Sequence, residues 1–341
     1  MTLNFVSVFN KGGVPMKRWG VLIIIFSIVL ASCDNDNKSS ASNKQFPDEM
    51  VEIVAPASPG GGWDTTARAI QKIMIDEELT KQNVNVINKP GGGGEIGWQY
   101  LKSRSPNTIS INSSLLLSNN ELGLSDLGTD DFTPIAILAT EWISLTASNQ
   151  SNLDSGKKVM EKLKENPESL TIGVAPGLGN NDHLAFVQAA KAYGVDVDKI
   201  DFLVYKSGGD LQTALLGGHV DVASTSVSEV KEQHQTGKLK MLAVTSDKPV
   251  EGIEDVPTWK EQGIDVVFPH WRGVMGPKDM TPEQIAYWDE TMKDVVKSDR
   301  WQEIRKNNDW ENYYKDSQES EKFLKDQRKK YKELVKDSGM K

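Results

Sequence analysis

The chain is 341 residues long, with 38% hydrophobic and 26% charged residues, a composition that can bury a normal core over two domains of ordinary size. Its formal net charge is −9. Nucleic-acid binding needs a basic face, and no basic stripe occurs in the interior of the sequence, so we expect no nucleic-acid partner.

The chain is predicted to begin with an export signal. Met16 opens the run MKRWGVLIIIFSIVLASC, in which a basic pair precedes an apolar stretch and small residues precede the single cysteine, Cys33. Leu30–Cys33 resembles the lipobox of bacterial lipoproteins, so residues 1–32 are expected to be a lipoprotein signal peptide and Cys33 its lipidation site; the alternative is a plain signal peptide. Residues 33–47 are polar and predict a flexible tether. We therefore expect an exported protein, lipid-anchored to the outer face of the cytoplasmic membrane or otherwise attached to a membrane in the periplasm.

Two strand–glycine–helix units are predicted next. VEIVAP, NVNVIN and NTISINSS are expected strands, and the glycine turns SPGGGWDTT and KPGGGGEIG each open a helix. In the first helix Ala67, Ile70, Ile73 and Met74 fall on one face. Alternating strands and helices predict an α/β fold with a parallel sheet, and ligands bind such sheets at the carboxyl ends of the strands.

The second glycine turn satisfies the dinucleotide fingerprint G-x-G-x-x-G at Gly92, Gly94 and Gly97. The fingerprint is incomplete, because the following strand region, ISINSSLLLSNN, carries no carboxylate for a ribose. Neither turn has the Lys-Ser/Thr of a P-loop. We expect no nucleotide or other cofactor and interpret both turns as anion sites, where backbone N–H groups at a helix N-terminus approach a carboxylate. The alternative is that the glycines only permit tight turns.

Further strands are expected at SLTIGVA, IDFLVYK, VDVAST and KLKMLAVTS. The turn PGLGNN is predicted to start a helix capped by Asn181 or Asp182 and ended by Gly194. From Thr281 onward the sequence predicts helices, with Phe323, Leu324, Tyr331 and Leu334 roughly on one side of the last.

The crossings between two domains are predicted near Trp142–Ser148 and Pro269–Gly273. They divide the folded part into domain 1, residues 48–146 plus 271–341, and domain 2, residues 147–270.

Five ordered segments carry a family resemblance over nearly the whole mature chain: APASPGGGWDTTARAI, NKPGGGGEIGWQYL, IGVAPGLGNNDHLAFVQAAKAYGVD, VYKSGGDLQTALLGGHVDVASTSVSEV and VPTWKEQGIDVVFPHWRGVMGP. They resemble the substrate-binding proteins of tripartite tricarboxylate transporters, the TctC or Bug family. The resemblance implies a type II periplasmic-binding-protein fold with two α/β domains around a ligand cleft. It further implies that hinge closure captures a small carboxylate for delivery to the membrane permease subunits. We expect a monomer.

The resemblance places ligand loops at Ser58–Asp64, Pro90–Gly94 and Ala175–His183. The chain departs from the commoner family pattern at Leu178, and at Asn180 and Asn181, whose amides can still donate hydrogen bonds. The ligand-binding residues expected from the loops and from the strand ends are Ser58, Gly60, Gly61, Gly62, Asp64, Thr65, Gly92, Gly93, Gly94, Ser113, Gly179, Asn180, Asn181, His183 and Arg272.

Several of these residues have a structural alternative. Asp64 caps a helix or contacts the ligand. Ser113 makes ordinary turn contacts or lies near the ligand, His183 is a packed histidine or a cleft residue, and Arg272 pairs with a ligand carboxylate or forms a hinge salt bridge. The segments GGGWDTTARA and PHWRGVMGP favour a citrate-like or C4-dicarboxylate ligand by resemblance, whereas a free Asp64 carboxylate would suit an ammonium group.

The sequence does not favour an enzyme. No cysteine follows Cys33, the four histidines show no H-x₃-H spacing, and GVAPG lacks the serine of a nucleophile elbow, so neither a metal site nor a catalytic residue is expected. Two alternatives to transport remain: a solute-sensing lipoprotein that docks on a signalling partner and, less favoured, a hydrolase with a Ser/His/Asp site assembled from distant segments.

Overall fold

The computed structural model describes residues 46–338, which belong to one compact unit. The expected signal peptide, Cys33 and all but the end of the expected tether lie outside the described residues. Within residues 46–338 no helix has both the length and the apolar composition that crossing a membrane requires.

Ten strands pair within the described residues. They are β1 (Val51–Ala55), β2 (Val84–Asn88), β3 (Thr108–Ser113), β4 (Phe132–Ser148), β5 (Thr171–Val174), β6 (Asp201–Val204), β7 (Val222–Ser226), β8 (Leu239–Val244), β9 (Pro269–Pro277) and β10 (Glu311–Lys315). All seven strands predicted from hydrophobic runs are present, and β4, β9 and β10 are additional.

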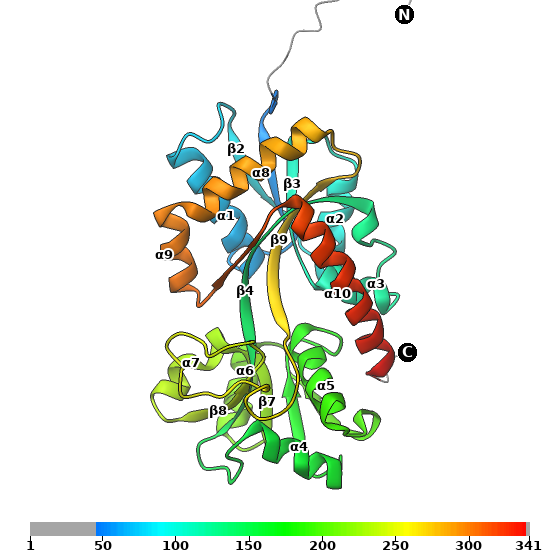
Figure 1. The fold of residues 1–341 in the computed structure, drawn as a ribbon, viewed down its shortest axis with the longest axis vertical. Helices are drawn as coiled ribbons and strands as arrows, with labels where there is room; N and C mark the ends of the chain where they lie inside the picture. Colours follow the sequence, from blue (N-terminus) through cyan, green and yellow to red (C-terminus); the bar gives the residue numbers. More distant parts are fainter. Residues whose placement is uncertain (1–45, 339–341) are drawn as a thin grey trace, which may run out of the picture. The chain divides into compact units, whose positions relative to one another are not determined.

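The strands form two sets that share β4 (Figure 1). In the first set, called sheet A, β2, β1 and β3 are parallel, and β9 runs antiparallel between β3 and β4. In the second, called sheet B, β6, β5 and β7 are parallel, and β4 lies antiparallel between β7 and β8. Trp142 of β4 still pairs with Pro269 of β9, whereas Ile143 pairs with Ser226 of β7. The change of partner falls in the predicted first crossing, and the two-domain division itself stays a prediction.

Helices cover the parallel strands. They are α1 (Gly62–Asp76), α2 (Glu95–Lys102), α3 (Leu115–Glu121), α4 (Gly156–Glu165), α5 (Asn181–Tyr193), α6 (Gly208–Leu216), α7 (Val227–Gln235), α8 (Pro282–Lys297), α9 (Asp299–Asn307) and α10 (Ser317–Asp337). Short 3₁₀ turns occur at Gly92–Gly94, Thr129–Asp131 and Val197–Lys199.

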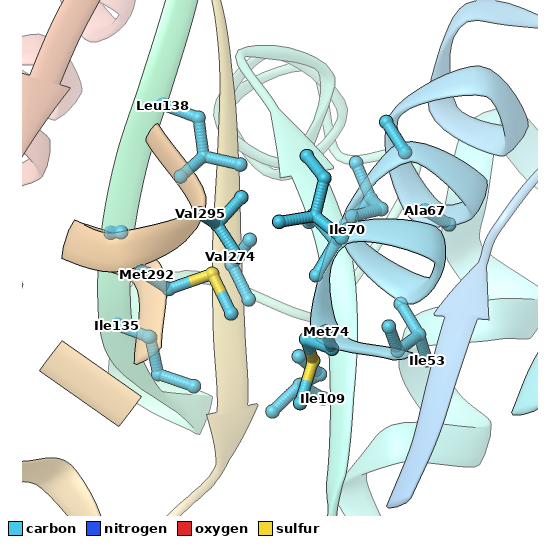
Figure 2. Close-up of a cluster of buried hydrophobic side chains, with 14 of the residues drawn as sticks. Ile53, Ala67, Ile70, Met74, Ile109, Ile135, Leu138, Val274, Met292 and Val295 are labelled. Carbon is cyan, nitrogen blue, oxygen red and sulfur yellow. The ribbon is translucent and has the colours of Figure 1, made fainter. Parts of the chain in front are cut away.

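The core of sheet A forms where α1 and α8 pack on the strands (Figure 2). The predicted apolar face of α1 is fully buried, because its residues recur at three- and four-residue spacing and so face the same side. Figure 2 shows Ile70 and Met74 of α1 beside Ile53 and Ile109 of the strands. This packing fixes the start of α1 at the carboxyl end of β1.

Two local predictions need correction. Asn180, rather than Asn181 or Asp182, caps α5: its backbone is extended and its side-chain oxygen accepts the N–H of His183 at 3.0 Å. The last part of the chain is not helical throughout, because Glu311–Lys315 forms β10 and pairs with β4. Tertiary pairing with β4 thus gives these five residues an extended conformation between two helices.

Candidate functional site

The first glycine turn, Ser58–Gly62, joins β1 to α1 and leaves the helix start uncapped. Gly61 occupies the N-cap position, and no side chain in the described residues caps this helix. Gly60 has a φ of +86°, a conformation that favours glycine. Ser58 is exposed, and its carbonyl oxygen accepts the N–H of Gly61 at 3.4 Å. The first N–H groups of α1 are therefore available at the positive end of the helix dipole.

Asp64 lies just inside α1 and is 3% exposed. Its Oδ2 accepts the N–H of Gly60 at 2.8 Å and Nε of Arg68 at 2.9 Å, while Oδ1 accepts Nδ2 of Asn88 at 2.8 Å. Burial acts to raise the pKa of Asp64, but these three hydrogen bonds outweigh it and the pKa is lowered. Both oxygens are engaged in holding the turn, but none of their donors is a first-turn N–H group of α1, so Asp64 does not cap this helix; direct ligand contact stays a prediction.

A cavity of about 460 Å³ opens beside this turn. Residues from both sheets contribute to its wall: Gly60, Gly62, Thr65, Glu141, Ser226, Ser228, Glu229, His270, Arg272, Asn307, Asn308, Asp309 and Trp310. Four of the predicted ligand residues are among them, namely Gly60, Gly62, Thr65 and Arg272. The cavity is therefore the place where the first glycine turn meets the strand β9.

Arg272 reaches from β9 to the glycine turn. A Cβ atom added to Gly62 would lie 3.2 Å from Nη2 of Arg272, so the glycine makes room for the guanidinium group. Nη2 donates to Oε1 of Glu141 at 2.5 Å, and the guanidinium carbon lies 4.7 Å from the ring centroid of Trp310. Arg272 is 8% exposed, and its Nε is buried without a hydrogen-bond partner among the described residues.

Glu141 is a buried carboxylate at the centre of this wall, 4% exposed. Its Oε2 accepts the hydroxyl of Ser228 at 2.9 Å, and Oε1 lies 3.3 Å from Nδ1 of His270. Burial acts to raise the pKa of Glu141, but the charge of Arg272 leads the effects that hold the pKa below its usual value. Burial lowers the pKa of His270 to about 4, so His270 is neutral at pH 7. Arg272 therefore faces an ionised internal partner.

Sequence reasoning missed Glu141, Ser228, Glu229, His270 and Trp310. For Glu141 a usable signal existed, because it is a single carboxylate inside the apolar run IAILATEWISL, where a buried charge needs a partner. The other four carry no comparable local pattern.

The second glycine turn lies outside the wall of the cavity. Gly92, Gly93 and Gly94 all have positive φ, between 58° and 106°. A Cβ atom on Gly94 would lie 2.6 Å from the ring of Trp98, and one on Gly93 would lie 2.9 Å from Nδ2 of Asn119. These glycines serve backbone conformation and close packing, and their contact with a ligand stays a prediction.

The third turn also lies outside the cavity wall. The N–H of Gly179 donates to Nδ1 of His183 at 3.1 Å, and burial lowers the pKa of His183 to about 4. Asn181 accepts the hydroxyl of Ser114 at 2.5 Å and that of Tyr331 at 3.1 Å, which joins the end of β3 to α5 and α10.

Ser113, at the carboxyl end of β3, is 1% exposed, and its hydroxyl accepts the N–H of Leu115 at 3.4 Å. Ser113 and the predicted ligand residues of the third turn thus each make a contact within the protein. Their contact with a ligand stays a prediction. Nowhere in residues 46–338 do three or more His, Cys, Asp or Glu side chains gather so that they could hold a metal ion.

Comparison with known proteins gives concordant matches. A family model described as "Tripartite tricarboxylate transporter family receptor" matches residues 66–340. A UPF0065 protein of Cupriavidus necator is 28% identical over 309 residues, which cover 89% of this chain and 91% of that protein.

Two solved structures show the same fold. A TctC solute-binding protein from Polaromonas matches with a TM-score of 0.76 and 27% identity, covering 85% of this chain and 99% of that one. An R. palustris protein solved with adipate matches with a TM-score of 0.70 and 23% identity, covering 86% and 98%. The predicted α/β binding-protein fold is thereby confirmed.

Proposed function

This chain belongs to the tripartite tricarboxylate transporter receptor family of solute-binding proteins, and from that premise we propose that it captures a small carboxylate outside the cytoplasm and delivers it to the permease subunits of such a transporter. Its family and its structural neighbours are solute-binding proteins rather than enzymes. The resemblance of Leu30–Cys33 to a lipobox supports anchoring through lipidated Cys33, which mass spectrometry of the membrane-bound protein would test.

One observation carries this proposal: the uncapped start of α1 and the guanidinium of Arg272 meet at the wall of one cavity. Backbone N–H groups at a helix N-terminus and an arginine are both donors that suit a carboxylate. A structural neighbour solved with adipate supports a carboxylate ligand for this chain.

Residues from both sheets line the cavity, which supports capture of the ligand by closure of the two sides. Gly60, Gly62 and Thr65 belong to the sheet A side, whereas Ser226, Ser228 and Glu229 belong to β7 and α7 on the sheet B side. A ligand that contacts both sides binds a closed arrangement better than an open one and shifts the population toward it.

The test is a thermal-shift screen of the exported domain with di- and tricarboxylates, monocarboxylates and acidic amino acids. We expect a rise in Tm with at least one carboxylate, and Gly62→Val should abolish it because the new side chain fills the space between the start of α1 and the Arg272 guanidinium. Gly128→Val is the matched control, since Gly128 has an extended backbone, has no atom closer than 3.6 Å to an added Cβ, and does not line the cavity. No shift with any carboxylate, or an equal shift in both variants, would contradict the proposed site.

A further inference from the structure

The side chains that line the cavity include more acidic than basic groups, which disfavours a ligand with several negative charges. Among the lining residues, Arg272 is the sole lysine or arginine, whereas three acidic residues, Glu141, Glu229 and Asp309, line the same wall. His270 adds no positive charge at neutral pH, because burial lowers its pKa to about 4.

The positive charge of Arg272 is already matched inside the protein. Its Nη2 lies 2.5 Å from Oε1 of Glu141, and both residues are more than nine-tenths buried. The Ser228 hydroxyl holds the second oxygen of Glu141, so the carboxylate is fixed in place. A ligand carboxylate beside Arg272 therefore meets a neutral pair and depends on the N–H groups of α1 for its anchoring.

The other two acidic residues differ in their partners. Asp309 pairs with Lys231 of α7 at 2.5 Å, which offsets its charge. Glu229 is exposed and accepts a hydrogen bond from the Thr225 hydroxyl, and no lysine or arginine in residues 46–338 forms an ion pair with it. Its carboxylate lies against Gly208 at the N-terminus of α6. Burial of this carboxylate group, together with the nearby charge of Glu141, raises the pKa of Glu229 above its usual value, although the Thr225 hydroxyl acts to lower it.

The remaining wall offers neutral hydrogen-bonding groups, which are the hydroxyls of Ser226 and Ser228, the ring of His270 and the amides of Asn307 and Asn308. These groups can satisfy a hydroxyl or an amide, but they cannot neutralise a second carboxylate. Placing one there would bring like charges together in a partly desolvated site, where Coulomb repulsion is stronger than in water.

We propose that this cavity accepts a ligand with one carboxylate and a neutral, hydrogen-bonding remainder, and that Glu141 is the specificity-determining residue that excludes a second carboxylate. The inference rests on the proposed carboxylate-binding function and narrows it. It departs from the sequence-based preference for a di- or tricarboxylate, because Arg272, for which pairing with a ligand carboxylate was one of two expectations, donates to Glu141.

Calorimetry with matched ligands tests this selectivity on the wild-type protein. The probes are succinate, glutarate and adipate, each beside its own monoamide, which keeps the length and shape but replaces one carboxylate by a neutral amide. We expect the preferred monoamide to bind about tenfold more tightly than its parent dicarboxylate. Equal or tighter binding of the dicarboxylates would overturn the inference and leave the carboxylate function standing, whereas no binding of any of the six would count against the proposed function and the inference together.

Glu141→Gln tests the assigned residue. Removing this negative charge frees the guanidinium of Arg272, so the affinity ratio should move about tenfold toward the dicarboxylate. Glu52→Gln is the control, because Glu52 also accepts a hydrogen bond, from Tyr100, but does not line the cavity; its ratio should stay at the wild-type value. If Glu141→Gln folds and leaves the ratio unchanged, Glu141 is not the determinant, and if it fails to fold, the wild-type comparison still decides the ligand class.

Discussion

The first and second glycine turns look alike in the sequence and differ in the folded chain. Both follow a strand and open a helix of sheet A. Gly61 of the first turn has a φ of −76° and no atom closer than 3.5 Å to an added Cβ, and the helix after it has no side-chain cap. Gly94 of the second has a φ of 106° and lies against the ring of Trp98. The first turn thus keeps its donors open beside a cavity, and the second uses its glycines for packing.

The difference shows why a glycine pattern alone does not identify a ligand site. A glycine is required either by a positive φ, by a neighbour that leaves no room for a Cβ, or by a ligand that approaches the backbone. The sequence cannot separate these causes, because Trp98 and Arg272 reach the two turns only in the folded chain. Substitutions in the two turns should therefore differ in their effect on stability.

Gly94→Ala should lower the free energy of unfolding by about 3 kcal/mol or more, since the residue combines a left-handed backbone with an overpacked contact to Trp98. Gly61→Ala, in the first turn, should change it by less than about 1 kcal/mol because the site is open and the backbone extended. Urea denaturation of both variants measures the difference. If Gly94→Ala and Gly61→Ala lowered the free energy of unfolding by similar amounts, the two turns would not differ in how tightly their glycines are packed.

His183, next to the third turn, is a buried histidine with 1% of its surface exposed. Burial lowers its pKa to about 4. Because the unfolded chain binds a proton near pH 6.5, the stability contributed by neutral His183 is complete above that value and is lost as the pH falls toward 4, by roughly 3 kcal/mol. His183→Asn should remove this acid-side loss while keeping an acceptor for the N–H of Gly179.

The measurement is the difference in unfolding free energy between wild type and His183→Asn from pH 8 to pH 4. His219→Asn, at an exposed histidine, serves as the control and should follow the wild-type curve. A difference that stays constant over the pH range would mean that His183 has the same pKa in the folded and unfolded chains, as expected of a residue in an open cleft.

Asp64→Asn should lower the free energy of unfolding by about 1 to 2 kcal/mol, because it weakens hydrogen bonds that hold the first turn. The folded pKa of Asp64 lies below 3.8, so its contribution is complete above that value and is lost as the pH falls through the folded pKa. Carboxylate affinity should change less than about twofold. Calorimetry that shows tight binding of amino acids only, abolished in this variant, would instead make Asp64 a ligand contact.

Much of the fold followed from the sequence because its causes are local. Apolar residues at helical spacing predicted the buried face of α1, and short apolar runs predicted β1, β2, β3 and the parallel strands of sheet B. The family resemblance rested on five ordered segments, two of which contain the glycine turns of sheet A, and the family-model match over residues 66–340 confirms it. Local periodicity did not predict β4, because its residues are buried almost without alternation and its partners are distant strands.

The composition of the candidate site was decided by tertiary structure. Gly60, Gly62 and Thr65 were predicted from their turn, and Arg272 from its place at a crossing between sheets. The partner of Arg272 could not be predicted, because Glu141 is 131 residues away and reaches it only through the antiparallel register of β4 and β9. The sequence by itself determined that donors for one carboxylate lie at the start of α1. The pairing of β4 with β9 decided that the nearby charge of Arg272 is already neutralised by Glu141. A buried arginine needs a counter-charge, and only the folded chain brings that counter-charge to it.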